Sequence, residues 1–309
     1  MVRIGLLALL VLLSGGGAAQ AADPAMTLEI GGITRSYVLH VPTPWPAKPP
    51  PVVLAFHGGG GTGRRMAGLA GLDPLADRYG FIVAYPDGID RHWNDGRSTI
   101  KRKIDDVGFV AALLDEFERS YKIDRARIYA TGISNGAMFS ERLGCDLAGR
   151  IAAIAPVAGT MPADLAGACR PSAPVSVLQI GGTADPIMPF DGGAVADFGG
   201  RGEGGTVLSD ARSSALWAGL DRCPAPAAAT TLPPAAPPDG TSVSRTIWAP
   251  CAGGARVVQL AIQGGGHTWP GGPQYLPKLI IGPVSHQLDT ATAIVDFFLA
   301  TPGHKGATP

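Results

Sequence analysis

The chain has 309 residues, of which 46% are hydrophobic and 16% are charged, so it can bury a large core and is not disordered as a whole. Its 25 basic residues equal its 25 acidic residues. This balance excludes a protein drawn to nucleic acid or to an acidic membrane by its overall charge. We therefore expect a neutral or weakly charged substrate, and no nucleic-acid or membrane partner.

The first 21 residues have the pattern of a secretory signal peptide. Arg3 precedes an apolar run from Ile4 to Leu13, and small residues follow up to Ala21. The run is shorter than the roughly 20 residues that a membrane-spanning helix needs. We expect cleavage after Ala21 and export of residues 22–309, either to a periplasm or out of the cell.

Short runs rich in Val, Ile and Leu recur along the chain and predict the strands of a mostly parallel sheet. An alternating, half-buried strand is expected first, at 36–41. The further expected strands cover 52–57, 81–85, 127–131, 151–158, 175–180 and 257–262. Helical periodicity lies between them, at 105–121, after residue 134 and at 289–299. This alternation predicts one doubly wound α/β domain with helices on both faces of the sheet, spanning 22–309.

Two stretches interrupt this pattern. Residues 191–206 are rich in glycine, and residues 224–241 are rich in proline and alanine. The second stretch has the composition of a linker, but Cys223 and Cys251 flank it. We therefore interpret 224–250 as a loop excursion from the single domain, and we expect both stretches to help select the substrate.

Four cysteines in an exported protein predict two disulfides, for which three pairings are possible. We expect the neighbours to pair, Cys145 with Cys169 and Cys223 with Cys251. Each bridge would close a loop of about 25 residues and stabilise the fold by roughly 3 kcal/mol. A zinc site is the weaker interpretation, because the chain has no CxxC motif and no histidine near these cysteines at ligand spacing.

The sequence ATGISNGAM at 130–138 places Ser134 between Gly132 and Gly136 at GxSxG spacing. This pattern also occurs by chance in ordinary turns. Here, however, an expected strand precedes it and an expected helix follows it, which is the context of a nucleophile elbow. Side chains at the two glycine positions would collide with neighbouring elements. We therefore predict that Ser134 is an exposed nucleophile.

A serine nucleophile needs a base and an acid that orients the base. His267 lies in GGGHTWPGG directly after the expected strand 257–262, and Asp185 follows the expected strand 175–180. Asp191 and Asp289 are rival acids that lack this position at a strand end. The order Ser134, Asp185, His267 is the chain order of α/β-hydrolase triads.

The glycine-rich stretch FHGGGGTG at 56–63 follows an expected strand and predicts an oxyanion hole. Either Gly58 or Gly59 would donate one backbone N–H, and Asn135, the residue after the nucleophile, would donate the other. We expect His57 to hold this loop in shape and not to transfer protons.

The chain resembles the polyhydroxybutyrate depolymerase-like esterases, a secreted α/β-hydrolase group related to feruloyl and acetylxylan esterases. The resemblance runs from about residue 32 to residue 299 and is carried by FHGGGGTG, AYPDGIDRHWN, DDVGF, RIYATGISNGAM, IAAIAPVAGTM, IGGTADPIMPF and GGGHTWPGG. It implies that Ser134, Asp185 and His267 form the triad. It also implies that Trp93 and Trp269 are walls of the active site, although a core position is equally expected for Trp93.

These features together predict an exported, monomeric serine esterase that works through an acyl-enzyme and needs no metal or organic cofactor. Its expected substrates are polyhydroxyalkanoate-type oligoesters, or feruloyl or acetyl esters of plant polysaccharide. An exported serine peptidase of the same fold is one alternative, because a triad does not by itself distinguish amides from esters. A catalytically silent polymer-binding protein is the other.

Overall fold

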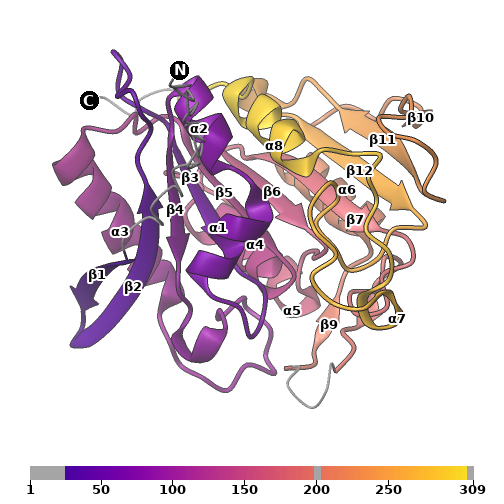
Figure 1. Ribbon diagram of the computed structural model, residues 1–309, viewed down its shortest axis with the longest axis horizontal. Helices are drawn as coiled ribbons and strands as arrows, with labels where there is room; N and C mark the ends of the chain where they lie inside the picture. Colours follow the sequence, from indigo (N-terminus) through magenta and orange to yellow (C-terminus); the bar gives the residue numbers. More distant parts are fainter. Residues whose placement is uncertain (1–24, 198–202, 305–309) are drawn as a thin grey trace, which may run out of the picture.

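The computed structural model describes residues 25–197 and 203–304, so the predicted signal peptide lies outside the described residues. Within them, one ten-stranded sheet runs across the molecule (Figure 1). Its strands, in spatial order, are β1 (Ala25–Ile30), β2 (Ile33–His40), β4 (Ile82–Pro86), β3 (Val52–Phe56), β5 (Ile128–Ile133), β6 (Ala153–Val157), β7 (Ser176–Gly182), β12 (Val257–Gln263), β11 (Ser242–Trp248) and β10 (Thr230–Thr231).

The centre of this sheet is parallel and its two edges are antiparallel. Strands β4, β3, β5, β6, β7 and β12 run parallel to one another. At one edge β2 pairs antiparallel with β4 and with β1, and at the other β11 pairs antiparallel with β12 and with β10. The predicted α/β fold class is confirmed, and each expected strand is a strand of this sheet. Since the carboxyl ends of parallel strands share one edge, the loops after β3, β5, β7 and β12 converge there.

Helices cover both faces of the sheet. On one face pack α3 (Asp106–Tyr121), α4 (Asn135–Asp146) and α6 (Asp210–Leu220). On the other pack α1 (Gly63–Ala70), α2 (Asp73–Tyr79) and α8 (Thr290–Leu299), the last two labelled near the top of Figure 1. The short helices α5 (Ala163–Ala166) and α7 (Lys278–Ile281) lie in loops, and β8 (Gly193–Ala194) pairs with β9 (Thr206–Val207) outside the main sheet.

The helices α3 and α8 were both expected, and each begins with an aspartate cap. The Asp105 side chain accepts a hydrogen bond from the Gly108 N–H, and the Asp289 side chain accepts one from the Thr292 N–H. Helices α1, α2 and α6 were not expected from the sequence. Helix α6 has no clear apolar face in the sequence, because some of its buried residues, such as Asp210, are polar.

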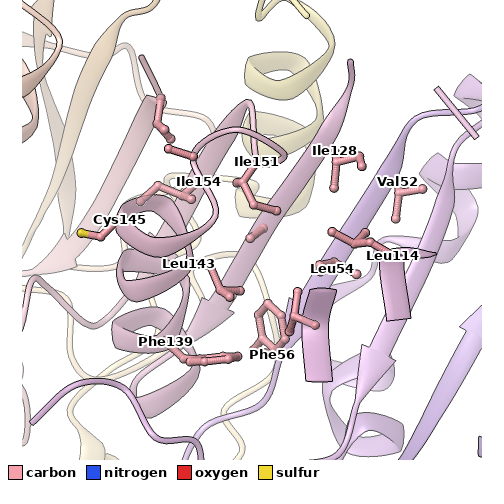
Figure 2. Packing of buried hydrophobic residues seen from close by; sticks show 14 of the residues in the cluster. Val52, Leu54, Phe56, Leu114, Ile128, Phe139, Leu143, Cys145, Ile151 and Ile154 are labelled. Atoms are coloured by element: carbon pink, nitrogen blue, oxygen red, sulfur yellow. The ribbon is translucent and has the colours of Figure 1, made fainter. Parts of the chain in front are cut away.

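Strand β3 shows how a central strand builds two cores at once. Val52, Leu54 and Phe56 face α3 and α4, whereas Val53 and Ala55 face α1, α2 and α8. Side chains on a strand alternate between faces, so an unbroken apolar run fills both layers. Figure 2 shows the first layer, where Phe139 and Leu143 of α4 lie over strands β3 and β5, and the Phe139 ring meets the Phe56 ring edge-on at 5.0 Å.

The two disulfides join Cys145 to Cys169 and Cys223 to Cys251, the pairing expected from the sequence. The segment between the second pair is not only a loop, which corrects the interpretation of 224–250. Strand β11 lies within it and pairs with β12 along its whole length, from Ser242 to Trp248. β11 contains Ser, Arg and Thr residues because one face of this strand, near the sheet edge, is partly exposed. These polar residues interrupt the apolar run by which the other strands were predicted.

Within the described parts of the chain, no helix is long and apolar enough to cross a membrane.

Three carboxyl groups are buried around α4, α6 and β7. Desolvation raises the pKa of Glu141, Asp210 and Asp221 to about 7 in each case. Hydrogen bonds oppose this shift: Ser213 and the Trp217 indole donate to Glu141, and the Gln179 and Gln259 amides donate to Asp210. These groups are protonated in the folded protein at a pH where the unfolded chain has already released those protons.

We therefore expect stability to fall as the pH rises from about 4 to about 7. In this window the native state binds more protons than the unfolded state, so the free energy of unfolding decreases with pH. Thermal unfolding between pH 5 and pH 8 measures the effect as a falling Tm. Glu141→Gln should flatten the profile, because a neutral amide can accept from Trp217 and donate to Ser213. A Tm that rises over this range would contradict the prediction.

Candidate active site

Ser134 occupies a sharp turn between β5 and α4. Its backbone has φ 59° and ψ −120°, a conformation that non-glycine residues rarely adopt. Two bonds hold the turn: the Ser134 N–H donates to Val157 O at 3.0 Å, and the Met138 N–H donates to Ser134 O at 3.0 Å. The strand, the strained turn and the helix are arranged as a nucleophile elbow requires. The amino end of α4 lies at this turn, where its dipole favours negative charge.

The two glycines of GISNG are required by close packing. A Cβ atom on Gly132 would lie 2.6 Å from Gly136 O and 2.7 Å from Phe56 O, and a Cβ on Gly136 would lie 2.6 Å from His57 O. All these atoms belong to the backbone of β3, α4 and the loop after β3, so none can move without displacing the site. The collisions expected from the sequence are confirmed.

Gly136→Ala is expected to destabilise the protein by about 2 kcal/mol or more, since overpacking against rigid backbone costs roughly 1–3 kcal/mol or more. Esterase activity should fall together with stability, because the glycine loop follows β3 and Ser134 directly precedes α4. Chemical denaturation with parallel assays measures both. Gly219→Ala is the control: Gly219 lies in α6, and a Cβ there would meet no atom within 4 Å. Unchanged stability in Gly136→Ala would contradict the packing argument.

Asp185 and His267 meet at the carboxyl edge of the sheet. His267 Nδ1 lies 2.8 Å from Asp185 Oδ2, and the two side chains are 6% and 2% exposed. The other carboxylate oxygen, Oδ1, accepts the N–H groups of Ile187 and Met188, both at 2.8 Å. The Asp185 carboxylate is thus fixed by its own loop and receives the Nδ1–H of the imidazole, which leaves Nε2 without a proton and able to accept one.

Tyr275 also holds the histidine loop, through a contact that no sequence pattern indicated. Its hydroxyl donates to His267 O at 2.7 Å, and the His267 N–H donates to Ile281 O at 2.6 Å. Burial, with a further contribution from Asp185, raises the pKa of the Tyr275 phenol, so it stays a donor. Only its place eight residues after His267 could have suggested this role.

Ser134 and His267 line the same cavity, which has a volume of about 750 Å³. Gly58, Gly59 and Asn135 line it as well. Much of the remaining wall is apolar and comes from several segments, including Met66, Leu69, Met138, Met188, Val195 and Leu276. From the stretch 191–206, Val195, Ala196 and Glu203 contribute to the wall. No residue of 224–250 lines the cavity, because that segment lies beside β12 at the edge of the sheet, so the cavity lining supports a role in substrate selection for the first stretch only.

The glycine loop offers two backbone donors to the cavity. The Gly60 N–H donates to Arg91 O and the Gly61 N–H donates to Gly58 O, so both are engaged. In the described chain, the N–H groups of Gly58 and Gly59 have no bonded acceptor. The Asn135 N–H belongs to the first turn of α4, where helix amides lack an intrahelical partner. These are the donors that an oxyanion hole needs.

His57 is a structural histidine. It is buried, its Nδ1 lies 2.8 Å from Gly58 O, and its Nε2 accepts the Gly88 N–H at 3.0 Å. These partners require a proton on Nδ1 and none on Nε2. Burial lowers its pKa, which keeps the ring neutral. His57 therefore holds the glycine loop to the loop after β4.

Neither tryptophan forms a wall of the cavity, which corrects the expected role of Trp93 and Trp269. They are 0% and 1% exposed and are absent from the cavity lining. The Trp93 ring stacks on Phe139 at 5.1 Å, and its indole N–H donates to His57 O. Large apolar rings are stabilised by full burial, so Trp93 supports the glycine loop from behind.

In the described residues, no group of three or more His, Cys, Asp or Glu side chains is placed to hold a metal ion.

Comparisons with known proteins point to esterases. Residues 35–203 match the family model described as esterase PHB depolymerase. NocK of Nocardia uniformis subsp. tsuyamanensis, which is named as an esterase, is 36% identical over 91% of this chain and 84% of its own length. Feruloyl esterase B of Piromyces equi is 29% identical over 72% of this chain, and a bifunctional acetylxylan esterase/xylanase of Neocallimastix patriciarum is 29% identical over 71%.

The match covers only 40% and 29% of the lengths of these last two relatives. Among solved structures, an acetyl xylan esterase from Aspergillus awamori superposes with a TM-score of 0.60 at 16% identity, covering 89% of this chain and 99% of that one, which supports the α/β-hydrolase fold. The family match and the similarity to NocK together identify the chain as a member of the PHB depolymerase esterase family, a carboxylic ester hydrolase.

Proposed function

We propose that the protein hydrolyses esters by a serine mechanism. Ser134 Oγ attacks the carbonyl carbon of the ester while His267 Nε2 takes its proton. The tetrahedral intermediate then loses the alcohol: the carbon–oxygen bond breaks, and the proton passes from Nε2 to the leaving oxygen. A water molecule attacks the acyl-enzyme in the same way, giving its proton to Nε2, and Ser134 recovers a proton when the acid leaves.

The negative charge of the tetrahedral intermediate is stabilised by backbone N–H groups. The Asn135 amide and the amide of Gly58 or Gly59 donate to the oxyanion, and the amino end of α4 adds a favourable dipole. Asp185 keeps the proton on Nδ1 of His267 in the resting enzyme and stabilises the imidazolium that forms during the reaction.

The observation that carries this proposal is the placement of a strained serine and an aspartate-bound histidine on one cavity. The Asp185 to His267 distance is 2.8 Å, and Ser134 lines the cavity with His267. These residues lie at the ends of β5, β7 and β12, which are far apart in sequence and converge only in the fold.

We propose as substrates polyhydroxyalkanoate-type oligoesters, or feruloyl or acetyl esters of plant polysaccharide. Relatives named for feruloyl and acetylxylan esters support the second group, and the family description supports the first. The largely apolar cavity fits either an aliphatic or an aromatic acyl group. Turnover of hydroxybutyrate oligomers, methyl ferulate and acetylated xylan, compared side by side, selects among them.

We further propose that the enzyme acts outside the cytoplasm as a single-domain monomer. The two disulfides support an oxidising compartment. Mass spectrometry of the exported protein should find a new amino terminus after Ala21, and size-exclusion chromatography should find one chain per particle.

The serine mechanism is tested with a fluorophosphonate, which phosphonylates an activated serine. We expect one adduct, mapped by peptide mass spectrometry to Ser134, and loss of p-nitrophenyl butyrate turnover in proportion to labelling. An active enzyme that takes no label at Ser134 would refute the mechanism.

A further inference from the structure

Asn135, whose backbone follows the nucleophile, is anchored by its side chain. Its Oδ1 accepts the Trp93 N–H at 2.8 Å, and its Nδ2 donates to Trp93 O at 3.0 Å and to Asp95 Oδ2 at 2.7 Å. The side chain is buried, so all three bonds are formed away from solvent. An amide held at both ends has one orientation, and this fixes the first turn of α4 against the loop that carries Asp95.

Asp95 in turn forms a buried ion pair with Arg97. Arg97 Nε lies 3.0 Å from Asp95 Oδ1, Arg97 Nη2 lies 2.8 Å from Oδ2, and the Arg97 backbone N–H also donates to Oδ1. The two side chains are 0% and 3% exposed. A buried ion pair adds little net stability because both charges must be desolvated. The two-pronged geometry of this ion pair is therefore better explained by a role in positioning Asp95 than by a contribution to stability.

Arg97 extends this contact chain to the wall of the cavity. Its Nη1 donates to Gly204 O, and its Nη2 lies 3.7 Å from Glu203 Oε2. Gly205 has φ +87°, and a Cβ there would lie 2.8 Å from Arg97 Cδ, so the backbone before β9 packs directly on the arginine. Arg97, Glu203 and Val195 all line the cavity.

We propose that Asp95 and Arg97 are a positioning pair that fixes the Asn135 amide of the oxyanion hole and ties it to the cavity wall beside β8 and β9. This inference rests on the proposed role of the Asn135 amide. Asp95 acts through the Asn135 side chain, and Arg97 acts through Asp95, the Glu203 side chain and the backbone at Gly204 and Gly205. A substrate that contacts this wall is thereby held at a constant distance from the oxyanion donors.

Asp95→Asn keeps the shape of the side chain but has one oxygen where four N–H donors now share two. One amide orientation sets its NH₂ against Asn135 Nδ2 and Arg97 Nη2, and the other sets it against Nε and the backbone N–H of Arg97. Since loss of a whole oxyanion donor costs about 10²–10³-fold in kcat, we expect the displaced donor to lower kcat for p-nitrophenyl butyrate by about tenfold or more. KM should change by less than about twofold.

The affinity for a boronic acid separates positioning from folding. Butylboronic acid forms a tetrahedral adduct on an active serine and places an oxygen where the oxyanion forms, so it reports transition-state stabilisation. Its inhibition constant should rise in parallel with the fall in kcat in Asp95→Asn. An inhibition constant that stays at the wild-type value would overturn the proposal.

Asp106→Asn is the matched control. Asp106 forms another buried ion pair, with Arg35 at 2.7 Å, and contacts neither Asn135 nor the cavity. Its second oxygen accepts the Asn94 N–H at 2.8 Å, a bond that the side-chain oxygen of asparagine can keep. It should lower Tm with kcat and the inhibition constant within about twofold of wild type. Equal losses of kcat in both variants would show that any broken ion pair suffices and would overturn the proposal.

Arg97→Lys provides a second test that does not depend on the folding of Asp95→Asn. Lysine keeps the charge but cannot bind Asp95 with two prongs and Gly204 O together. We expect a higher KM from the loosened wall and a lower kcat, and wild-type values of both would overturn the proposal. If the wild-type enzyme itself takes no fluorophosphonate at Ser134, the serine mechanism fails; if it is labelled and these variants behave as wild type, only this inference fails.

Discussion

Ser134→Ala is expected to lower kcat for p-nitrophenyl butyrate by about 10⁵-fold or more, since removing the nucleophile of a serine triad leaves only binding and the oxyanion donors, and costs about 10⁶-fold in a serine protease. The loss should be in kcat, with KM little changed. The fold should stay intact, because the Ser134 side chain accepts no helix-capping hydrogen bond and its backbone bonds are independent of the hydroxyl.

Ser140→Ala is the control for this variant. Ser140 lies six residues after Ser134 in α4, is buried, and donates to Gly136 O at 2.9 Å without lining the cavity. It should keep kcat within a few-fold of wild type. Steady-state kinetics of both variants, with circular dichroism as a check on folding, measure the difference. Substantial turnover in Ser134→Ala would contradict the assignment of the nucleophile.

Asp185→Asn is expected to lower kcat by about 10⁴-fold, the size of the same change in a serine protease triad. The structure gives the reason. The Ile187 and Met188 N–H groups donate to Oδ1, so the single oxygen of asparagine is held there and its NH₂ faces His267 Nδ1. The imidazole must then accept at Nδ1 and carry its proton on Nε2, which is the wrong tautomer for a base.

Asp191→Asn tests the rival acid of the same segment. Asp191 is exposed and lies outside the cavity lining, so the kcat of Asp191→Asn should stay within about twofold of wild type. A rise of activity with pH in Asp185→Asn, as hydroxide replaces the missing base, would support the tautomer argument. Equal losses in the two variants would show that Asp185 has no special role.

The order of the candidate triad could be predicted from the sequence because each residue is marked by its neighbours. GISNG between a strand and a helix marks Ser134, and an apolar run before a glycine-rich loop marks His267 and Asp185. Parallel strands bring such loops to one edge, so the spacing in sequence does not matter. The collisions at Gly132 and Gly136 also followed from the pattern, since only a crowded turn needs two flanking glycines.

Contacts between distant segments could not be predicted in this way. Trp93 is a residue type that often lines a cavity. In this fold its ring packs against Phe56 and Phe139, behind the glycine loop. Tyr275 and Arg97 look like ordinary loop residues, yet one bonds the His267 backbone and the other bonds the backbone before β9. Their roles depend on hydrogen-bond partners that cannot be predicted from the neighbouring sequence.

Residue patterns predicted the α/β class and the candidate nucleophile, base and acid, because periodicity and strand-end motifs are local properties of the chain. They left three disulfide pairings possible, of which the expected one is present in the structure. The folded structure was needed to show that β11 joins the sheet, that both tryptophans are buried, and which side chains line the cavity. Those features are set by packing between elements remote in sequence, where burial and hydrogen-bond partners, and not residue type, assign the role.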